Sequence, residues 1–108
     1  MIYTLDEIKK RILPVIEKYD IPAMYLFGSY ARGEATEESD LDFLVDTTGT
    51  GLTSLLSLGA LYCDLEEVFQ KSIDLITMRS VMQNVETESE RRFRDAVIRE
   101  RVKLNDVA

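Results

Sequence analysis

The chain has 108 residues, of which 45% are hydrophobic, and its formal net charge is −7. It contains no histidine and one cysteine, which excludes Ser-His-Asp triads, His-containing zinc sites and intramolecular disulfides. Nucleic-acid-binding domains usually carry the opposite charge, so direct binding of nucleic acid is not expected, and metal cations or basic protein surfaces fit better.

The length predicts one domain that spans residues 1–108. The first residues, MIYTLDEIKKR, are charged and amphipathic, and they lack the apolar run of a signal peptide. No apolar run approaches the ~18 residues of a membrane span. The lone Cys63 is compatible with a reducing compartment. We therefore expect a cytoplasmic protein with no membrane association.

Residues 4–19 are expected to form the first helix, because apolar residues recur there at steps of three and four. Thr4 is a plausible N-cap, and Asp6 and Glu7 in the first turn suit the positive end of the helix dipole. Pro14 lies inside this pattern, where a proline costs ~3 kcal/mol in an ideal helix. The sequence therefore predicts a kink or a break at Pro14.

Two strands are expected on either side of a polar, glycine-marked loop. The first is AMYLF, residues 23–27, and the second is LDFLV, residues 41–45. Alternation in the second strand divides its residues between two faces, with Leu41, Phe43 and Val45 on one and Asp40, Asp42 and Leu44 on the other. The loop itself predicts a turn, with room for one short helical turn.

The second half of the chain is expected to hold a helix at residues 52–70, a strand at 72–77 and a helix at 81–100. Residues 102–104 either finish the last helix or form a short edge strand. The apolar side of the helix at 52–70 consists of Leu55, Leu58, Tyr62, Leu65 and Phe69. Because helices must cover the hydrophobic strands, this order of elements predicts a small α+β or α/β sandwich.

Charged residues in the last expected helix recur four apart. The pairs are Glu88–Arg92, Glu90–Arg94 and Asp95–Arg99. Each pair stabilises a helix by about 0.2–0.5 kcal/mol, which favours a solvated helix face. A basic docking surface near the C-terminus is the alternative.

Three aspartates lie in or next to the expected strands. Asp40 and Asp42 are two residues apart, so on a strand their side chains share one face, with Cα atoms roughly 7 Å apart. Asp74 stands between Ile73 and Leu75, where an isolated acid is unusual unless its face meets a polar site. If the two strands are neighbours, the three carboxylates form a cluster that a hard cation, Mg²⁺ or Mn²⁺, would neutralise. The alternative is that each acid lies on a loop rim or a solvent-facing strand surface.

The loop after the first strand has the features of a phosphate site. Gly28 permits unusual backbone angles and close approach, Ser29 supplies a hydroxyl, and Arg32 supplies a planar donor group that suits phosphate. Gly33 lets the chain leave the turn, and a helical turn after Gly28 would direct N–H groups at an anion. The glycine-serine pair alone is compatible with an ordinary turn. Its combination with the three aspartates indicates a nucleoside triphosphate with its Mg²⁺.

The stretch GSYARGEATEESDLDFLV resembles the signature of the DNA polymerase beta-like nucleotidyltransferase superfamily: Gly-Ser, then Arg-Gly, then Ser-Asp-x-Asp on a strand. It looks most like the minimal nucleotidyltransferase (MNT) branch, and the resemblance covers nearly the whole chain. The resemblance implies a small mixed β-sheet with helices packed mainly on one face.

The same resemblance implies roles for individual residues. The nucleotide and its phosphates would be bound by Gly28, Ser29, Arg32, Gly33 and Ser39. Two Mg²⁺ ions, with Mn²⁺ as a substitute, would be bound by Asp40 and Asp42. Asp74 would be the third acid of the metal site and would orient or deprotonate the attacking hydroxyl. The reaction would be in-line attack on the α-phosphorus of ATP, with pyrophosphate leaving.

The MNT branch is typically encoded beside a helical HEPN-type partner, which is a toxic ribonuclease. The resemblance therefore implies an antitoxin that transfers AMP to a tyrosine of that toxin, and the acidic charge suits a basic protein partner. Two alternatives stay open. One is a non-catalytic antitoxin that acts by binding and occlusion. The other is a small-molecule nucleotidyltransferase of the aminoglycoside type, although such enzymes usually carry an extra acceptor domain.

Overall fold

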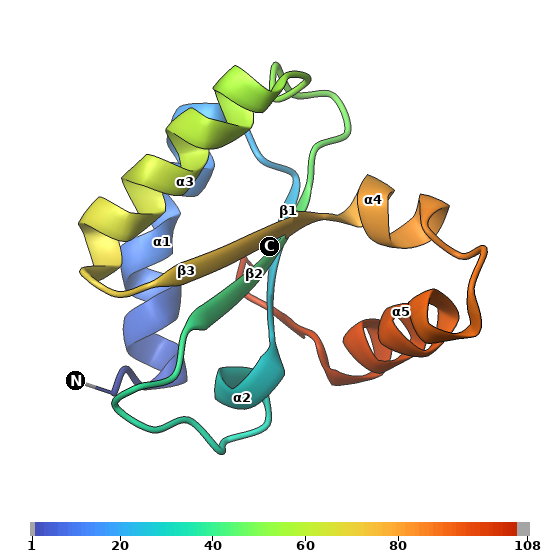
Figure 1. Ribbon diagram of the computed structural model, residues 1–108. Coiled ribbons are helices and arrows are strands. Elements are labelled where there is room, and N and C mark those ends of the chain that lie inside the picture. Colours follow the sequence, from blue (N-terminus) through green and yellow to red (C-terminus); the bar gives the residue numbers. More distant parts are fainter. Residues whose placement is uncertain (1, 106–108) are drawn as a thin grey trace.

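A four-stranded β-sheet organises residues 2–105, the part of the chain that the computed structural model describes (Figure 1). The strand order is β3-β2-β1-β4. β1 (Ala23–Phe27) runs antiparallel to β2 (Leu41–Asp46) and to the short edge strand β4 (Val102–Lys103). β3 (Ile73–Thr77) pairs with β2 in parallel, so the sheet is mixed, as the resemblance predicts.

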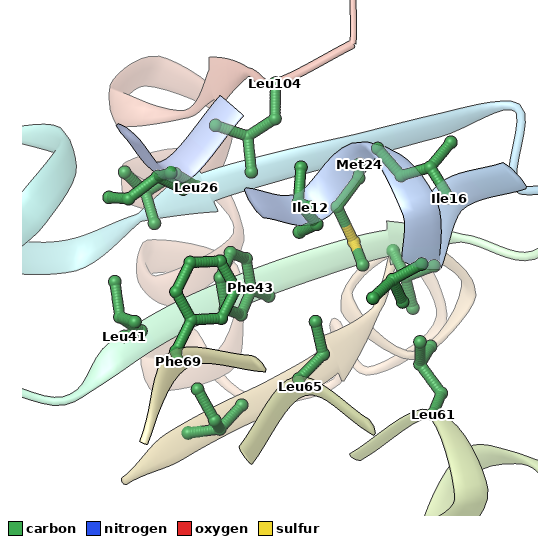
Figure 2. Packing of buried hydrophobic residues seen from close by; sticks show 14 of the residues in the cluster. Ile12, Ile16, Met24, Leu26, Leu41, Phe43, Leu61, Leu65, Phe69 and Leu104 are labelled. Atoms are coloured by element: carbon green, nitrogen blue, oxygen red, sulfur yellow. The ribbon is translucent and has the colours of Figure 1, made fainter. Parts of the chain in front are cut away.

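Two long helices, α1 (Leu5–Tyr19) and α3 (Leu55–Phe69), cover one face of the sheet. Figure 2 shows the main core between these helices and the sheet, where Phe43 of β2 lies against Phe69 of α3 with ring centroids 5.5 Å apart. Leu41, Phe43 and Val45 point into this core, as their alternation predicts. No helix within residues 2–105 is long and apolar enough to cross a membrane.

The opposite face carries two smaller helices, α4 (Met78–Gln83) and α5 (Glu88–Glu100). Their contact with the sheet is a small cluster formed by Phe27, Leu44, Val81 and Val97. The one-turn helix α2 (Gly28–Ala31) follows β1 directly. Helical cover is therefore concentrated on one face, and the second face is closed only in part.

The first helix begins as predicted but does not break at Pro14. Thr4 is its N-cap and forms a capping box with Glu7, and the helix continues through Pro14 to Tyr19. Pro14 is exposed, so water can hydrate the backbone carbonyl that loses its N–H partner there.

The apolar side predicted for the second helix is correct except at its start. The helix begins at Leu55 because Ser54 caps it, with a reciprocal contact to Ser57. Leu65 and Phe69 are buried, and Leu58 and Tyr62 are half-buried against the core. Leu61, which the prediction left out, is buried as well, whereas Leu55 is 91% exposed in the first turn. The prediction that Leu55 packs with the others is therefore wrong.

The helix predicted over residues 81–100 is two helices, separated at residues 84–87. Thr87 caps α5, and Glu90 completes the box by accepting a hydrogen bond from the Thr87 N–H at 3.0 Å. Glu90 is therefore engaged away from Arg94, which pairs with Asp95 instead. Among the three predicted ion pairs, Arg92 with Glu88 forms, at 2.8 Å.

Candidate active site

Asp42 lies in a row of side chains that crosses three neighbouring strands. It is opposite Phe27 of β1 and in register with Asp74 of β3. Side chains in register on adjacent strands point to the same face, so Asp42 and Asp74 both lie on the partly open face. Asp42 is half-buried, while Asp74 and Asp40 are exposed. The structure thus places the acid of the third strand beside the Asp40–Asp42 pair.

Gly28 fits against Asp42 in a way that excludes a side chain. Its φ is +72°, a conformation that L residues rarely adopt. A Cβ built at Gly28 would collide with Oδ2 of Asp42 and would stand 3.0 Å from its Cγ. Since Gly28 is also the first residue of α2, the start of this helical turn is held directly against the Asp42 carboxylate.

The surroundings of Asp42 disfavour the ionised form of its carboxyl group. Burial raises the pKa of Asp42 to about 6, and the carboxylates of Asp74 and Asp40 add to the rise. The guanidinium of Arg32 lowers it in part. The site therefore has a negative potential that a bound cation would relieve.

We expect the melting temperature of the chain in EDTA to rise as the pH is lowered from 7.5 to 5. The folded-state pKa of Asp42, about 6, lies above its ordinary value of 3.8, so the folded chain binds the proton more tightly and gains stability as the carboxyl is protonated. The carboxyl groups with lowered pKa, such as Asp64, lose their contribution only at lower pH. Calorimetry should show a smaller rise for Asp42→Asn, and an equal rise in both proteins would contradict the assignment.

An all-oxygen ligand set of Asp40, Asp42 and Asp74 has the chemistry that Mg²⁺ or Mn²⁺ requires. Within residues 2–105, however, no group of three or more acidic or cysteine side chains is already gathered closely enough to hold a metal ion. Like charges keep carboxylates apart unless a cation lies between them. The register of Asp42 with Asp74, the raised pKa of Asp42 and its close fit to Gly28 are compatible with a divalent cation. The metal role stays a prediction.

Arg32, predicted to bind phosphate, is engaged with two carboxylates. Its Nε donates to Glu34 and its Nη1 donates to Glu100 at the end of α5, each at 3.1 Å. The guanidinium is exposed in both pairs, and Glu34 is exposed while Glu100 is half-buried. Exposed ion pairs are weak, so an arriving phosphate can compete for the guanidinium. Sequence reasoning missed Glu100, because its partner is 68 residues away along the chain.

The other loop residues predicted to bind the nucleotide shape the backbone. Ser29 is half-buried in α2, and its carbonyl accepts a hydrogen bond from the Glu34 N–H at 2.9 Å. Gly33 has a φ of +73° and ends the turn. Ser39 accepts a hydrogen bond from the Thr36 N–H at 2.8 Å and so closes the loop just before Asp40.

Hollows lie at both ends of the parallel strands. A cleft of about 500 Å³ lies after Asp46 and Thr77, beyond the far ends of β2 and β3. Asp46 is four residues along β2 from Asp42, or roughly 13 Å, so this cleft is remote from the acids. An open hollow of about 400 Å³ lies beside Asp40, between the loop before β2 and residues 70–72. The larger of these two hollows is therefore not the one beside the acids, and cavity volume alone does not locate the active site.

Comparison with known proteins points to one family. The polymerase beta nucleotidyltransferase family matches residues 10–101. A Methanocaldococcus jannaschii protein with the provisional name protein adenylyltransferase is 44% identical over 77 residues, covering 71% of this chain and 81% of its own length. The protein adenylyltransferase MntA of Thermococcus cleftensis is 34% identical over 86 residues, covering 76% and 85%.

A solved structure shares the fold. It contains the MNT antitoxin of Shewanella oneidensis in complex with a tri-AMPylated HEPN toxin. The matching chain aligns with a TM-score of 0.63 at 19% identity, over 96% of this chain and 74% of that one. At this identity the likeness concerns the fold alone, and it agrees with the predicted mixed sheet.

Proposed function

Because the chain belongs to the polymerase beta nucleotidyltransferase family, we propose that it is an Mg²⁺-dependent protein adenylyltransferase. Its acceptor would be a tyrosine of a HEPN-type toxin, and AMP transfer would make the chain an antitoxin. The names of the two relatives and the AMPylated toxin in the Shewanella complex support this proposal. The observation that carries it is the in-register pair of Asp42 and Asp74 beside the Gly28 turn.

Some residues of the site would bind the metal, and others would bind the phosphates. When bound, Mg²⁺ held by Asp40, Asp42 and Asp74 would supply Lewis-acid stabilisation of the charge on the phosphates. Gly28 and Ser29 would offer backbone N–H groups to the triphosphate from the start of α2. Arg32 would exchange Glu34 and Glu100 for a phosphate oxygen, a change that suits a planar guanidinium.

Asp74 would receive the proton of the acceptor. It is exposed and lies on the edge strand of the sheet, so a hydroxyl that arrives from solvent reaches it without displacing Asp42. The phenolic oxygen would form a bond to the α-phosphorus as the bond to the bridging oxygen of the β-phosphate breaks. Pyrophosphate leaves, and the phenolic proton passes to Asp74.

A basic protein surface is the partner that the charge of this chain favours. The net charge is −7. Glu37 and Glu38 line the hollow beside Asp40, and Glu34 pairs with Arg32. Opposite charge would steer a basic partner toward the site and accelerate its association.

The test is transfer of label from ATP to a purified HEPN-type protein encoded beside this chain. With Mg²⁺ and ATP labelled at the α-phosphate, we expect label on one or more tyrosines of the partner, mapped by mass spectrometry. ATP labelled at the γ-phosphate should leave the partner unlabelled, because that phosphate departs in pyrophosphate. Absence of transfer to a partner with ribonuclease activity would contradict the proposal. Transfer to a small-molecule acceptor in its place would favour the aminoglycoside type.

A further inference from the structure

An apolar cleft of about 280 Å³ opens between α4 and α5 on the same sheet face as the acids. Its apolar lining includes Ile76 of β3, Val81 of α4 and Phe93 of α5. Its polar lining consists of Ser80, Asn84, Ser89 and Glu90, and the Glu90 carboxylate accepts the hydrogen bond from the Thr87 N–H. The single helix predicted over residues 81–100 would leave no such cleft.

The cleft lies within reach of the acids. Ile76 is two residues beyond Asp74 on β3 and points to the same face, which separates their Cα atoms by about 6.6 Å. One ribose joins the α-phosphate of a nucleotide to its base, and this spans a similar distance. A nucleotide with its α-phosphate at Asp42 and Asp74 can therefore extend its base toward Ile76.

Phe93 connects the cleft to the phosphate turn. Its ring meets the ring of Phe27 edge to face, with centroids 6.3 Å apart, and Phe27 is the residue before Gly28. Phe93 is 49% exposed. Burial of a large apolar side chain is favourable, so a ligand that covers this ring would gain binding energy. A flat ring that enters the cleft would cover this exposed surface, and stacking on an aromatic side chain stabilises a base.

We propose that the cleft between α4 and α5 binds the nucleobase of the donor nucleotide. This rests on the proposed function, because it takes the phosphates to lie at Gly28 and the acids. Asn84 Nδ2 donates to the Ser80 hydroxyl at 3.1 Å, while the Asn84 amide oxygen and the Ser89 hydroxyl can pair with the polar atoms on the edge of a purine. The side chain of an acceptor tyrosine has one polar atom, its reacting oxygen, and would leave this polar lining unused.

The test measures binding in the absence of any partner. We expect Phe93→Ala to weaken binding of AMP-PNP with Mg²⁺ at least tenfold by calorimetry. Its affinity for inorganic tripolyphosphate, which has no base, should stay within twofold of the unchanged chain. Ser89→Trp, which fills the cleft and removes no core contact, should have the same effect. Ile98→Ala is the matched control, because Ile98 is an exposed apolar residue of α5 outside the cleft.

Two outcomes would overturn this inference. In one, AMP-PNP binds both cleft variants as tightly as it binds the unchanged chain. In the other, the variants bind AMP-PNP normally but raise the KM for the protein acceptor, which would assign the cleft to the acceptor. Since AMP-PNP binding is measured without transfer, failure of the proposed activity would not alter the first reading, whereas the second requires transfer to the acceptor.

Discussion

Replacing Asp40 and Asp42 together with asparagine is expected to lower AMP transfer by about three orders of magnitude or more. Asparagine keeps the shape but removes the two charges that would hold Mg²⁺, and a bound metal contributes several kcal/mol to charge stabilisation. Each 1.36 kcal/mol is a factor of about ten in rate. Initial rates of label transfer from ATP to the HEPN-type partner measure the loss.

The double variant should stay folded, because the half-buried charge of Asp42 opposes folding at neutral pH. Asp46→Asn is the matched control. It makes the same change at the other end of β2, where Asp46 accepts a hydrogen bond from the Thr48 N–H that asparagine can also accept. We expect normal transfer from it. Transfer by the double variant at the rate of the control would contradict the roles of Asp40 and Asp42.

The same variant separates enzymatic from purely binding antitoxins. Loss of both transfer and neutralisation of the ribonuclease is the result expected for an adenylyltransferase. If the double variant still neutralises its partner fully, occlusion accounts for the antitoxin effect, and the carboxylates are not needed for it. A ribonuclease assay with equimolar partner gives the answer directly.

The parts of the fold that local patterns determine were predictable. Alternation in β2 placed Phe43 in the core and Asp42 on the other face, and the motif that includes Gly28 located the turn beside it. The split of the last helix was also readable, because Thr87 and Glu90 have the spacing of a capping box. The charged residues that recur four apart in this segment favoured one continuous helix over residues 81–100 instead.

Contacts between distant segments were not predictable in the same way. The pairing of Arg32 with Glu100 depends on how α5 returns to the sheet, and no local pattern encodes that path. The cleft beside Phe93 likewise exists only once α4 and α5 are placed on the same face as Asp74. The acids could be identified from sequence as candidates, whereas their surroundings required the fold.

Replacing Gly28 with alanine is expected to reduce AMP transfer by about 100-fold or more, beyond any effect on stability. The added Cβ would collide with Oδ2 of Asp42, so either the carboxylate or the α2 turn must move. A shift of about 1 Å in a positioned group can cost on the order of 100-fold in rate. The positive φ of +72° adds a backbone cost of about 1–3 kcal/mol for any residue with a side chain.

Gly49→Ala separates the backbone cost of a positive φ from the effect of the collision with Asp42. Gly49 has a φ of +73°, nearly the same as Gly28, but a Cβ there would meet nothing within 4 Å. Both variants should therefore lose a similar backbone contribution to the free energy of unfolding, measured by denaturant titration, while Gly28→Ala alone should lose transfer. Equal transfer by the two folded variants would show that the contact between Gly28 and Asp42 does not position the reacting groups. The strict requirement for glycine at the start of α2 would then be a matter of backbone strain alone.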